Sequence, residues 1–251
     1  MSGMFDLSGR VAIVTGANTG IGQGIAIALA EAGADVALVG RTPAEETAEE
    51  VRRAGRKAAI VHADLSTIAP VKGVVQRTTA ELGGVDILVN NAGIIRRADA
   101  LDFSEEDWDA VIDTNLKSVF FLSQAVARHM VEQGRGKIIN IASMLSFQGG
   151  IRVPSYTASK SGVAGLTKLL ANEWAAKGIN VNAIAPGYIA TNNTAALQDD
   201  EVRNRQILER IPARRWGKPS DLAGAAVFLA SDASDYVHGH ILAVDGGWLA
   251  R

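Results

Sequence analysis

A strand, a glycine-rich turn and a helix follow one another directly between residues 10 and 33. After Arg10 comes the apolar run VAIVTG, typical of a buried strand, then ANTGIG, then apolar residues at helical spacing. Glycines let a backbone approach a pyrophosphate, and the free amides at a helix N-terminus favour its negative charge. The spacing G-x-x-x-G-x-G differs from the G-x-G-x-x-G fingerprint, and a tight turn in any α/β protein would look similar. Because a strand precedes the turn and a helix follows it, we expect a dinucleotide site built by Gly16, Asn18, Thr19, Gly20, Ile21 and Gly22.

The rest of the chain repeats this alternation of strands and helices. Apolar, β-branched runs occur at 35–40, 58–64, 85–93, 137–142, 179–187 and 241–247, and helical patterns at 68–82, 105–133, 155–174 and 220–231. Such alternation predicts an α/β protein with a doubly wound, Rossmann-type parallel sheet and helices on both faces. No linker, charge run or internal repeat divides the 251 residues, so we expect a single domain over 1–251.

Composition argues against several classes of protein. The formal net charge of -2 provides no basic field for nucleic acid. The chain has no cysteine, and its four histidines lack zinc spacing, so we expect no bound metal. No basic region followed by an apolar run opens the chain, and no stretch of about eighteen apolar residues occurs. We therefore expect a cytoplasmic protein that acts on a small molecule and binds neither nucleic acid nor a membrane.

The ends of the second and third strands bear on the choice of dinucleotide. An NAD site normally has an acidic residue after the second strand to bind the ribose 2′-hydroxyl, whereas this chain has Arg41. Arg41 suits a 2′-phosphate, but the glycine turn offers no second basic residue, and Glu45 and Glu46 would oppose a phosphate dianion. We expect NAD(H) to be preferred and NADP(H) to be possible, with Asp64 and Leu65 beside the adenine.

The fourth strand and the long helix after it supply the next candidates. Asn91, Ala92 and Gly93 close the strand where the order of a doubly wound sheet reverses, and their small size leaves room for a cofactor. Asn115 lies in the middle of the long helical segment, although asparagine is a poor helix former there. A bond from its side chain to a backbone carbonyl, at a kink, would account for it.

A strand end, a loop and a helix start lie together between residues 140 and 163. Ser143 ends the strand, and Tyr156 and Lys160 are one turn apart on the helix, where an ammonium can favour the ionised phenol. A phenol titrates near pH 10, so its pKa must fall by roughly three for proton transfer near neutrality. Taken alone, a Tyr four residues before a Lys is also compatible with an ordinary exposed pair.

Taken in order, the chain holds TGANTGIG, NNAG, Asn115, Ser143, Tyr156-x-x-x-Lys160 and Pro186-Gly187. In this order and at this spacing the motifs resemble the short-chain dehydrogenase/reductase family over essentially the whole chain. The resemblance implies that Tyr156 exchanges the proton of the carbonyl or alcohol and that Ser143 binds the same oxygen. Lys160 would hold the nicotinamide ribose and lower the Tyr156 pKa, and Asn115 would position a water that relays protons to Lys160. Three further residues would lie near the nicotinamide, Pro186, Gly187 and Thr191.

Longer stretches include NNAGIIRRADALDFSEEDWD, IASMLSFQGGIRVPSYTASKSGV, APGYIATNNTAAL, RIPARRWG and VDGGWLAR. They resemble one branch of that family, the deoxygluconate dehydrogenases, whose members act on deoxy keto-sugar acids from pectin or alginate breakdown. Independently, the expected pocket rim offers groups suited to a carboxylate and several hydroxyls, namely Arg96, Arg97, Gln148, Arg152, Asn192 and Asn193. Each is also compatible with a solvated rim. Arg152 is the best carboxylate candidate, because its loop leads directly into Tyr156.

These observations predict an NAD(P)-dependent oxidoreductase that interconverts a ketone and a secondary alcohol on a deoxy keto-sugar acid. We expect it to work as a reductase with NADH, forming 2-keto-3-deoxy-D-gluconate. The alternatives are another reductase of the family, acting on an acyl-carrier ketone or on a polyol or gluconate, and a dinucleotide-sensing module without turnover. The polar segment 188–217 is expected to form a lid over the substrate. The resemblance implies a homotetramer built on paired long helices and the C-terminal strand.

Overall fold

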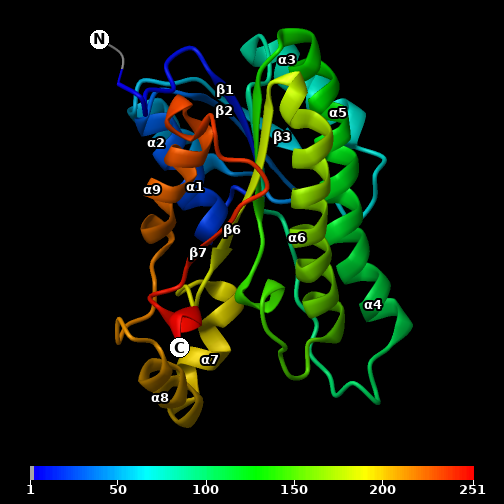
Figure 1. Cartoon of the computed structure of the whole chain (residues 1–251), viewed down its shortest axis with the longest axis vertical. Helices are drawn as coiled ribbons and strands as arrows, with labels where there is room; N and C mark the ends of the chain where they lie inside the picture. Colours follow the sequence, from blue (N-terminus) through cyan, green and yellow to red (C-terminus); the bar gives the residue numbers. More distant parts are fainter. Residues whose placement is uncertain (1–2) are drawn as a thin grey trace.

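A seven-stranded parallel sheet runs through the computed structural model, which describes residues 3–251 (Figure 1). The strands are β1 (Val11–Thr15), β2 (Asp35–Gly40), β3 (Ala58–His62), β4 (Ile87–Asn90), β5 (Gly136–Ile141), β6 (Ile179–Pro186) and β7 (Ile241–Val244). All neighbours pair in parallel, in the order β3-β2-β1-β4-β5-β6-β7. Successive strands are added outward in one direction from β1 to β3 and in the other direction from β4 to β7, so the strand order reverses between β1 and β4. This is the point where sheets of this kind open a crevice. The predicted Rossmann-type architecture is confirmed.

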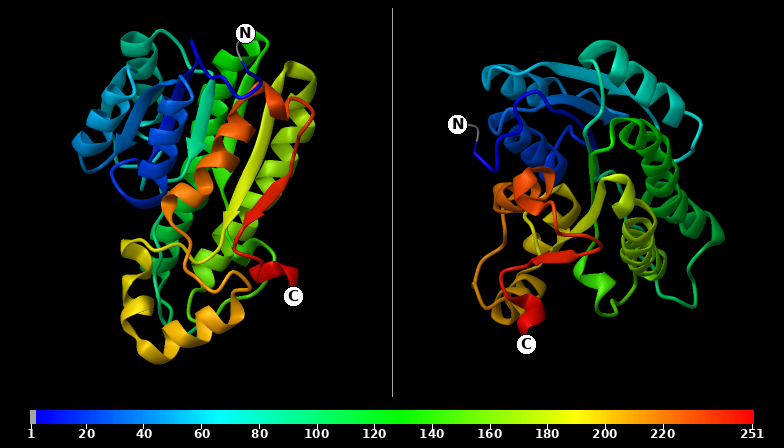
Figure 2. Two further views of the ribbon diagram at one scale, coloured as in Figure 1. Left: turned by 90° about the vertical axis from the view of Figure 1, so that its left-hand side faces the viewer. Right: turned by 45° about the horizontal axis from the view of Figure 1, so that its top comes forward.

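Helices cover both faces of the sheet. One layer contains α1 (Gly20–Glu31), α2 (Glu45–Arg53) and α9 (Ala223–Ala230), and the other contains α3 (Val71–Leu82), α5 (Ser118–Gln133) and α6 (Pro154–Trp174) (Figures 1 and 2). Side chains of β1 alternate between the layers, with Ala12 and Val14 in one core and Ile13 in the other. Because both faces are covered, the strands read as nearly continuous apolar runs. No helix within residues 3–251 is long and apolar enough to cross a membrane.

The long helical segment predicted over 105–133 is divided in the structure. Helices α4 (Glu105–Ile112) and α5 flank a π-helical turn at Asp113–Lys117, and Asn115 lies in that turn. Asn115 Nδ2 donates to the backbone oxygen of Ile94 at 2.9 Å, and Asn115 Oδ1 accepts from the Ile94 amide at 2.8 Å. The predicted bond to a backbone carbonyl at an irregular turn is therefore present, and it fixes the loop after β4 against the helix.

The segment between Ala190 and Trp216 leaves the sheet and returns to it at one point. Ala190 N donates to Gly217 O at 2.8 Å, and Gly217 N donates to Tyr188 O at 2.9 Å. The excursion holds two short helices, α7 (Ala195–Asp199) and α8 (Glu201–Arg210), which lie beyond the carboxyl end of the sheet (Figure 1). The two ends of the excursion are tied together at the sheet, and its later part is also held by the C-terminal segment, because Ala213 N donates to Gly246 O at 3.0 Å and Ile207 packs with Trp248. We call this excursion the flap.

Candidate active site

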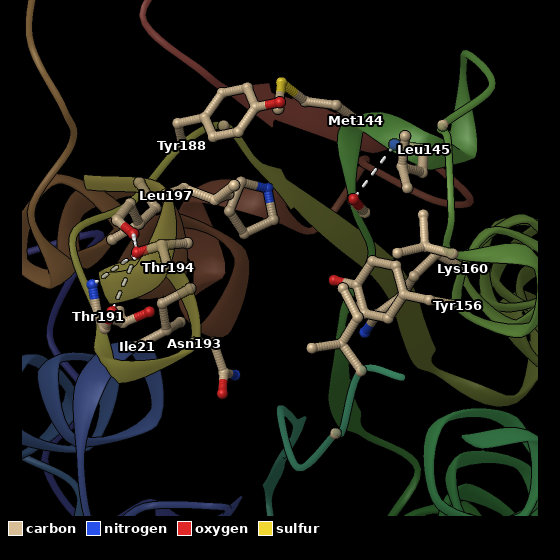
Figure 3. Close-up of a pocket in the computed structure, with 18 of the residues that line it drawn as sticks. Ile21, Met144, Leu145, Tyr156, Lys160, Tyr188, Thr191, Asn193, Thr194 and Leu197 are labelled. Atoms are coloured by element: carbon tan, nitrogen blue, oxygen red, sulfur yellow. Dashed lines mark hydrogen bonds between the residues drawn. The ribbon is translucent and has the colours of Figure 1, made fainter. Parts of the chain in front are cut away.

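A cavity of about 1020 Å³ opens where β1, β4, β5 and β6 end. Figure 3 shows Tyr156 and Lys160 on one wall, and Thr191, Asn193, Thr194 and Leu197, from the start of the flap, on the opposite wall. The structure brings together most of the predicted cofactor residues in this lining: Gly16, Asn18, Thr19, Gly20, Ile21, Asn91, Ala92, Gly93, Tyr156, Lys160, Pro186, Gly187 and Thr191. Ser143, Gln148 and Asn193 line the same cavity.

The glycine turn at the start of α1 has the shape required to cradle a pyrophosphate. Gly16 and Gly20 have positive φ values of 64° and 60°, which side chains rarely allow. A Cβ on Gly22 would overlap the backbone oxygen of Gly16 and the side chain of Asn91, so Gly22 serves close packing and does not itself line the cavity. Thr19 precedes α1 without capping it through its side chain, which leaves the first helix amides for an anion. These features fit a nicotinamide dinucleotide.

Asn91 fastens the loop after β4 to the glycine turn. Its Nδ2 donates to Thr15 O at 2.8 Å and to Gly16 O at 3.2 Å. In return, Thr15 Oγ1 accepts from the backbone amides of Asn91 at 3.0 Å and Ala92 at 2.9 Å. The Asn91 amide is thus used to hold two loops together, and its part in a cofactor site is to fix their shape.

Ser143, Tyr156 and Lys160 meet at the other wall of the cavity. Lys160 Nζ lies 5.7 Å from the centre of the Tyr156 ring and donates to Ile141 O at 2.6 Å. Ser143 follows the end of β5 and caps the 3-10 turn at Met144–Ser146. Its Oγ accepts from the Leu145 amide at 3.1 Å, which leaves its hydroxyl hydrogen to be donated elsewhere. Proline at the first position of α6 fixes where the helix begins. The three groups are therefore held by a strand end, a capped turn and a long helix.

Burial governs the ionisation of this pair. Desolvation raises the pKa of the Tyr156 phenol, although the hydrogen bond from Ser143 and the charge of Arg97 both act to lower it. Desolvation also lowers the pKa of Lys160 to about 8. The lowering of the phenol pKa that the sequence predicts is not present in the protein alone, because the cost of burying a phenolate is larger; the prediction also relied on the positive ring of a bound cofactor. A further positive charge in the cavity is needed before the phenol can ionise near neutrality.

The predicted substrate groups do not all lie in the cavity. Arg97, Gln148, Asn192 and Asn193 line it, but Arg96 and Arg152 do not. Arg96 pairs with Asp107 at 3.0 Å, and Arg152 pairs with Asp99 at 3.2 Å with its side chain 62% exposed. The loop of Arg152 does lead into Tyr156, as the sequence suggests, but its guanidinium is directed to a surface carboxylate. Arg97 instead donates to Asn193 O at 3.3 Å across the cavity.

Three predicted residues of the adenosine end lie beyond the cavity lining. Arg41 follows β2 and is exposed, and Leu65, after β3, is buried. Asp64 Oδ1 accepts from the Ser66 amide at 3.0 Å. That bond lowers the Asp64 pKa, and the charges of Arg41 and His62 add to the lowering. All three residues lie at the same edge of the sheet as the cavity, because β2 and β3 end beside β1.

Several residues that line the cavity are not among those predicted from the sequence. Helix α8 contributes Arg203, Gln206, Ile207 and Arg210, and the C-terminal segment contributes Trp248. Arg210 stacks over the Trp248 ring at 3.9 Å, and Gln148 Oε1 accepts from both side chains at 3.3 Å. A signal for α8 does exist in the sequence, since positions 203, 206, 207 and 210 share one helix face that is centred on the apolar Ile207.

The charges that line the cavity are all positive. Within residues 3–251 the lining contains Arg97, Lys160, Arg203 and Arg210, and it contains no aspartate or glutamate. The whole chain, by contrast, has 27 acidic and 25 basic residues. The cavity is thus a cationic site in a slightly acidic protein, and it favours an anionic ligand. No group of three or more His, Cys, Asp or Glu side chains in the described part of the chain is arranged to hold a metal ion.

Comparison with known proteins identifies the class to which this fold and site belong. A family model described as enoyl-(acyl carrier protein) reductase matches residues 16–249. The chain belongs to the short-chain dehydrogenase/reductase family, and it is an NAD(P)-dependent oxidoreductase.

Relatives with curated names place the chain within that family. It is 63% identical over 248 residues to the 2-dehydro-3-deoxy-D-gluconate 5-dehydrogenase of Escherichia coli (strain K12), covering 98% of each chain. The Bacillus subtilis (strain 168) protein of the same name is 59% identical over 251 residues, covering 98% of this chain and 97% of the relative. The structure also matches, with a TM-score of 0.93, a proposed 2-deoxy-D-gluconate 3-dehydrogenase from Agrobacterium tumefaciens with bound NADP. That protein is 62% identical, and the match covers 99% of both chains.

Proposed function

We propose that this enzyme interconverts a ketone and a secondary alcohol on a deoxy keto-sugar acid, and that it works as a reductase forming 2-keto-3-deoxy-D-gluconate with NADH. The charge of the cavity carries this proposal. In the part of the chain that the structure describes, the cavity of the catalytic phenol is lined by four cationic side chains and by no carboxylate, which suits a small acid whose carbonyl must reach that phenol. The printed names of the Escherichia coli and Bacillus subtilis relatives support the same class of substrate.

The proposed chemistry needs one hydride and one proton. When bound, the nicotinamide supplies the hydride to the ketone carbon. Tyr156 donates its phenolic proton to the ketone oxygen, and the Ser143 hydroxyl, whose oxygen already accepts from Leu145, donates a hydrogen bond to the same oxygen. The Lys160 ammonium binds the nicotinamide ribose and supplies charge beside the phenol. The product is the alcohol, and the phenol regains its proton from solvent.

Asn115 is proposed to position the water through which that proton returns toward Lys160. Its side-chain amide is bonded to both backbone groups of Ile94, and it also donates to Ser159 Oγ at 3.4 Å. The contact with water would therefore come from the main chain of the π-helical turn. Its hydrogen bonds to Ile94 also support Gly93, where an added Cβ would meet Asn115 Oδ1 at 3.2 Å.

For the cofactor, we propose that the glycine turn binds the pyrophosphate and that Arg41, Asp64 and Leu65 surround the adenosine. Pro186, Gly187 and Thr191 would bind the nicotinamide end. We propose NAD(H) as the preferred form and NADP(H) as a possible one. Glu45 and Glu46 occupy the first turn of α2, and their negative charges, close to Arg41 in the chain, would oppose a 2′-phosphate. The bound NADP of the Agrobacterium protein shows that a close relative accommodates the phosphate.

The proposed enzyme is a single domain over 1–251, in which 188–217 acts as the substrate lid. Apolar side chains exposed on the long helices, such as Trp108, Val131 and Leu169, support a homotetramer. A cytoplasmic location is proposed because the reaction draws on a recycled pool of nicotinamide cofactor. Light scattering after size exclusion tests the assembly.

A steady-state assay tests the function. The deoxy diketo acid that yields 2-keto-3-deoxy-D-gluconate should oxidise NADH with saturation kinetics, and the product should be identified by mass and chromatography. An acetoacetyl carrier thioester with NADH, and simple polyols assayed in the oxidative direction with NAD+, should be turned over far less efficiently. Efficient use of the thioester with no turnover of the acid would overturn the proposal in favour of an acyl-carrier reductase. Tight NADH binding without turnover of any ketone would indicate a sensing module.

A further inference from the structure

The three arginines of the cavity differ in the partners that they already have. Arg97 donates to the backbone oxygen of Asn193. Arg210 lies flat on the Trp248 ring and donates to Gln148, so its guanidinium is held in place by the C-terminal segment. Arg203 has one hydrogen bond from its guanidinium, to Gln206 Oε1 at 3.2 Å on its own helix. Within residues 3–251 it makes no ion pair, although Arg96 and Arg152, which lie outside the cavity, each pair with an aspartate.

Contacts along helix α8 fix the position of this helix and therefore the position of Arg203. Asp200 Oδ1 accepts from the Arg203 amide at 2.9 Å and so caps the start of α8. One turn further along the same face, Ile207 is 1% exposed and packs with Met144, Ile211 and Trp248. Trp216 Nε1 donates to Asn204 Oδ1 at 2.8 Å, which ties the helix to the end of the flap. Arg203 is therefore held at the cavity, half-buried, with most of its five N–H donors unused within the described chain.

We infer that Arg203 is the specificity-determining residue that binds the carboxylate of the substrate. This inference rests on the proposed function, and it goes further because it names a residue of the flap as the group that binds the substrate carboxylate. A planar guanidinium with adjacent unused donors can bind a carboxylate in a bidentate manner. Arg97 also keeps most of its donors, but its charge acts on the Tyr156 phenol, at the end of the cavity where the ketone reacts, whereas Arg203 lies on the flap. The ketone at Tyr156 and the carboxylate at α8 then fix which way round the acid lies. Because Arg203 belongs to the flap, the same ion pair holds the flap over the substrate.

Helix α8 offers a matched control for this assignment. Arg205 lies two residues along the same helix, is exposed and does not line the cavity. Arg203→Gln and Arg205→Gln remove the same charge from the same helix, so general electrostatic attraction falls equally in both. A difference between them reports direct contact with the substrate. Arg203→Lys retains the charge without the planar pair of donors, and it also provides a second variant if the glutamine substitution disturbs the helix.

The experiment compares two substrates for each protein, the deoxy diketo acid and its carboxamide, with NADH saturating. For the acid, Arg203→Gln should raise KM by about 10- to 100-fold while kcat changes by less than about threefold, because the lost ion pair acts on binding. For the carboxamide, neither constant should change by more than about threefold. Arg203→Lys should recover part of the loss, and Arg205→Gln should match the parent on both substrates. Hydrogen exchange over 201–210 should slow when the acid binds the parent, but not when it binds Arg203→Gln.

The outcomes separate this inference from the proposed function. If the parent prefers the acid and Arg203→Gln has the same KM for it as Arg205→Gln, the assignment of Arg203 is overturned while the function stands. If Arg203→Gln loses the acid and the carboxamide equally, Arg203 has a structural role and the inference also fails. If the parent itself reduces the carboxamide as well as the acid, or reduces neither, the proposed substrate class fails first.

Discussion

The two ends of the cavity differ in the atoms that form them: one end is mainly backbone, and the other is mainly side chains. The end proposed to bind the cofactor, here called the cofactor end, is formed mainly by backbone, with Gly16 and Gly20 in its lining, Gly22 packed against them and an uncapped helix N-terminus. The substrate end is formed by long side chains that come from the flap and the C-terminal segment, among them Arg203, Arg210 and Trp248.

This difference determines how each end tolerates change. A backbone cradle binds a feature that all dinucleotides share, and any added side chain disturbs it. A wall of side chains on a flap can be exchanged without altering the sheet, so it is where related enzymes can acquire different substrates. The predictions below test whether the two ends behave as separable parts.

The largest effect is expected where the two ends meet, at Tyr156. Tyr156→Phe removes the proton that the ketone oxygen receives, and no other side chain in the cavity can donate it in the same position. The value of kcat should fall by about a thousandfold or more, which corresponds to about 4 kcal/mol in the activation barrier. Steady-state kinetics measure the loss, and titration with NADH should give the affinity of the parent. Activity within about tenfold of the parent would contradict the proposed role.

A second prediction concerns the backbone cradle alone. Gly22→Ala places a Cβ against the Gly16 carbonyl and the Asn91 side chain, so the turn must shift. We expect a loss of about 1–3 kcal/mol in the free energy of unfolding and a clear loss of NADH affinity. Chemical denaturation and NADH titration measure the two effects.

Gly73 provides the control for that substitution. It lies inside α3, and a Cβ there would have nothing within 4 Å. Gly73→Ala should therefore stabilise the protein by up to about 1 kcal/mol through helix propensity and leave NADH affinity unchanged. Equal behaviour of the two variants would show that the cradle is less tightly packed than the structure indicates.

A third prediction uses pH to examine Lys160. Burial lowers its pKa from 10.5 to about 8, so its ammonium is present below pH 8 and is lost above it. If the ammonium binds the ribose, NADH affinity should fall about tenfold between pH 7 and pH 9. Stability should change in the opposite direction: between pH 8 and 10.5 the unfolded chain binds more protons at this residue, so stability rises with pH. In Lys160→Met both contributions should disappear, and an unchanged pH profile in that variant would assign them to another group.

The same contrast explains how far the sequence could be interpreted. The parallel sheet, the glycine turn and the positions of Ser143, Tyr156 and Lys160 follow from local patterns, because strand ends and helix spacing bring them together. Arg152 illustrates what local patterns cannot supply: its position beside Tyr156 in sequence suggested a carboxylate ligand, yet its guanidinium pairs with Asp99. Arg203 lies far from the catalytic residues in sequence and reaches the cavity through tertiary contacts of α8, such as the packing of Ile207 against Met144 and Trp248.

The smallest expected effect is on the choice between NADH and NADPH. It concerns the residues after β2, beside the cofactor end of the cavity. Arg41 is exposed beyond β2, and Glu45 and Glu46 are exposed in the first turn of α2. A 2′-phosphate would gain one cation and meet two carboxylates, with all of these charges screened over about 8 Å in physiological salt. We therefore expect a higher kcat/KM for NADH than for NADPH.

Replacing Glu45 and Glu46 together by Gln should improve kcat/KM for NADPH by about two- to fivefold and change that for NADH little, since each exposed pair contributes less than about 1 kcal/mol. Arg41→Ala should lower NADPH use and leave NADH use nearly unchanged. A parent enzyme with the higher kcat/KM for NADPH would show that the single arginine outweighs both glutamates, and that even at the backbone end of the cavity one exposed side chain selects the cofactor.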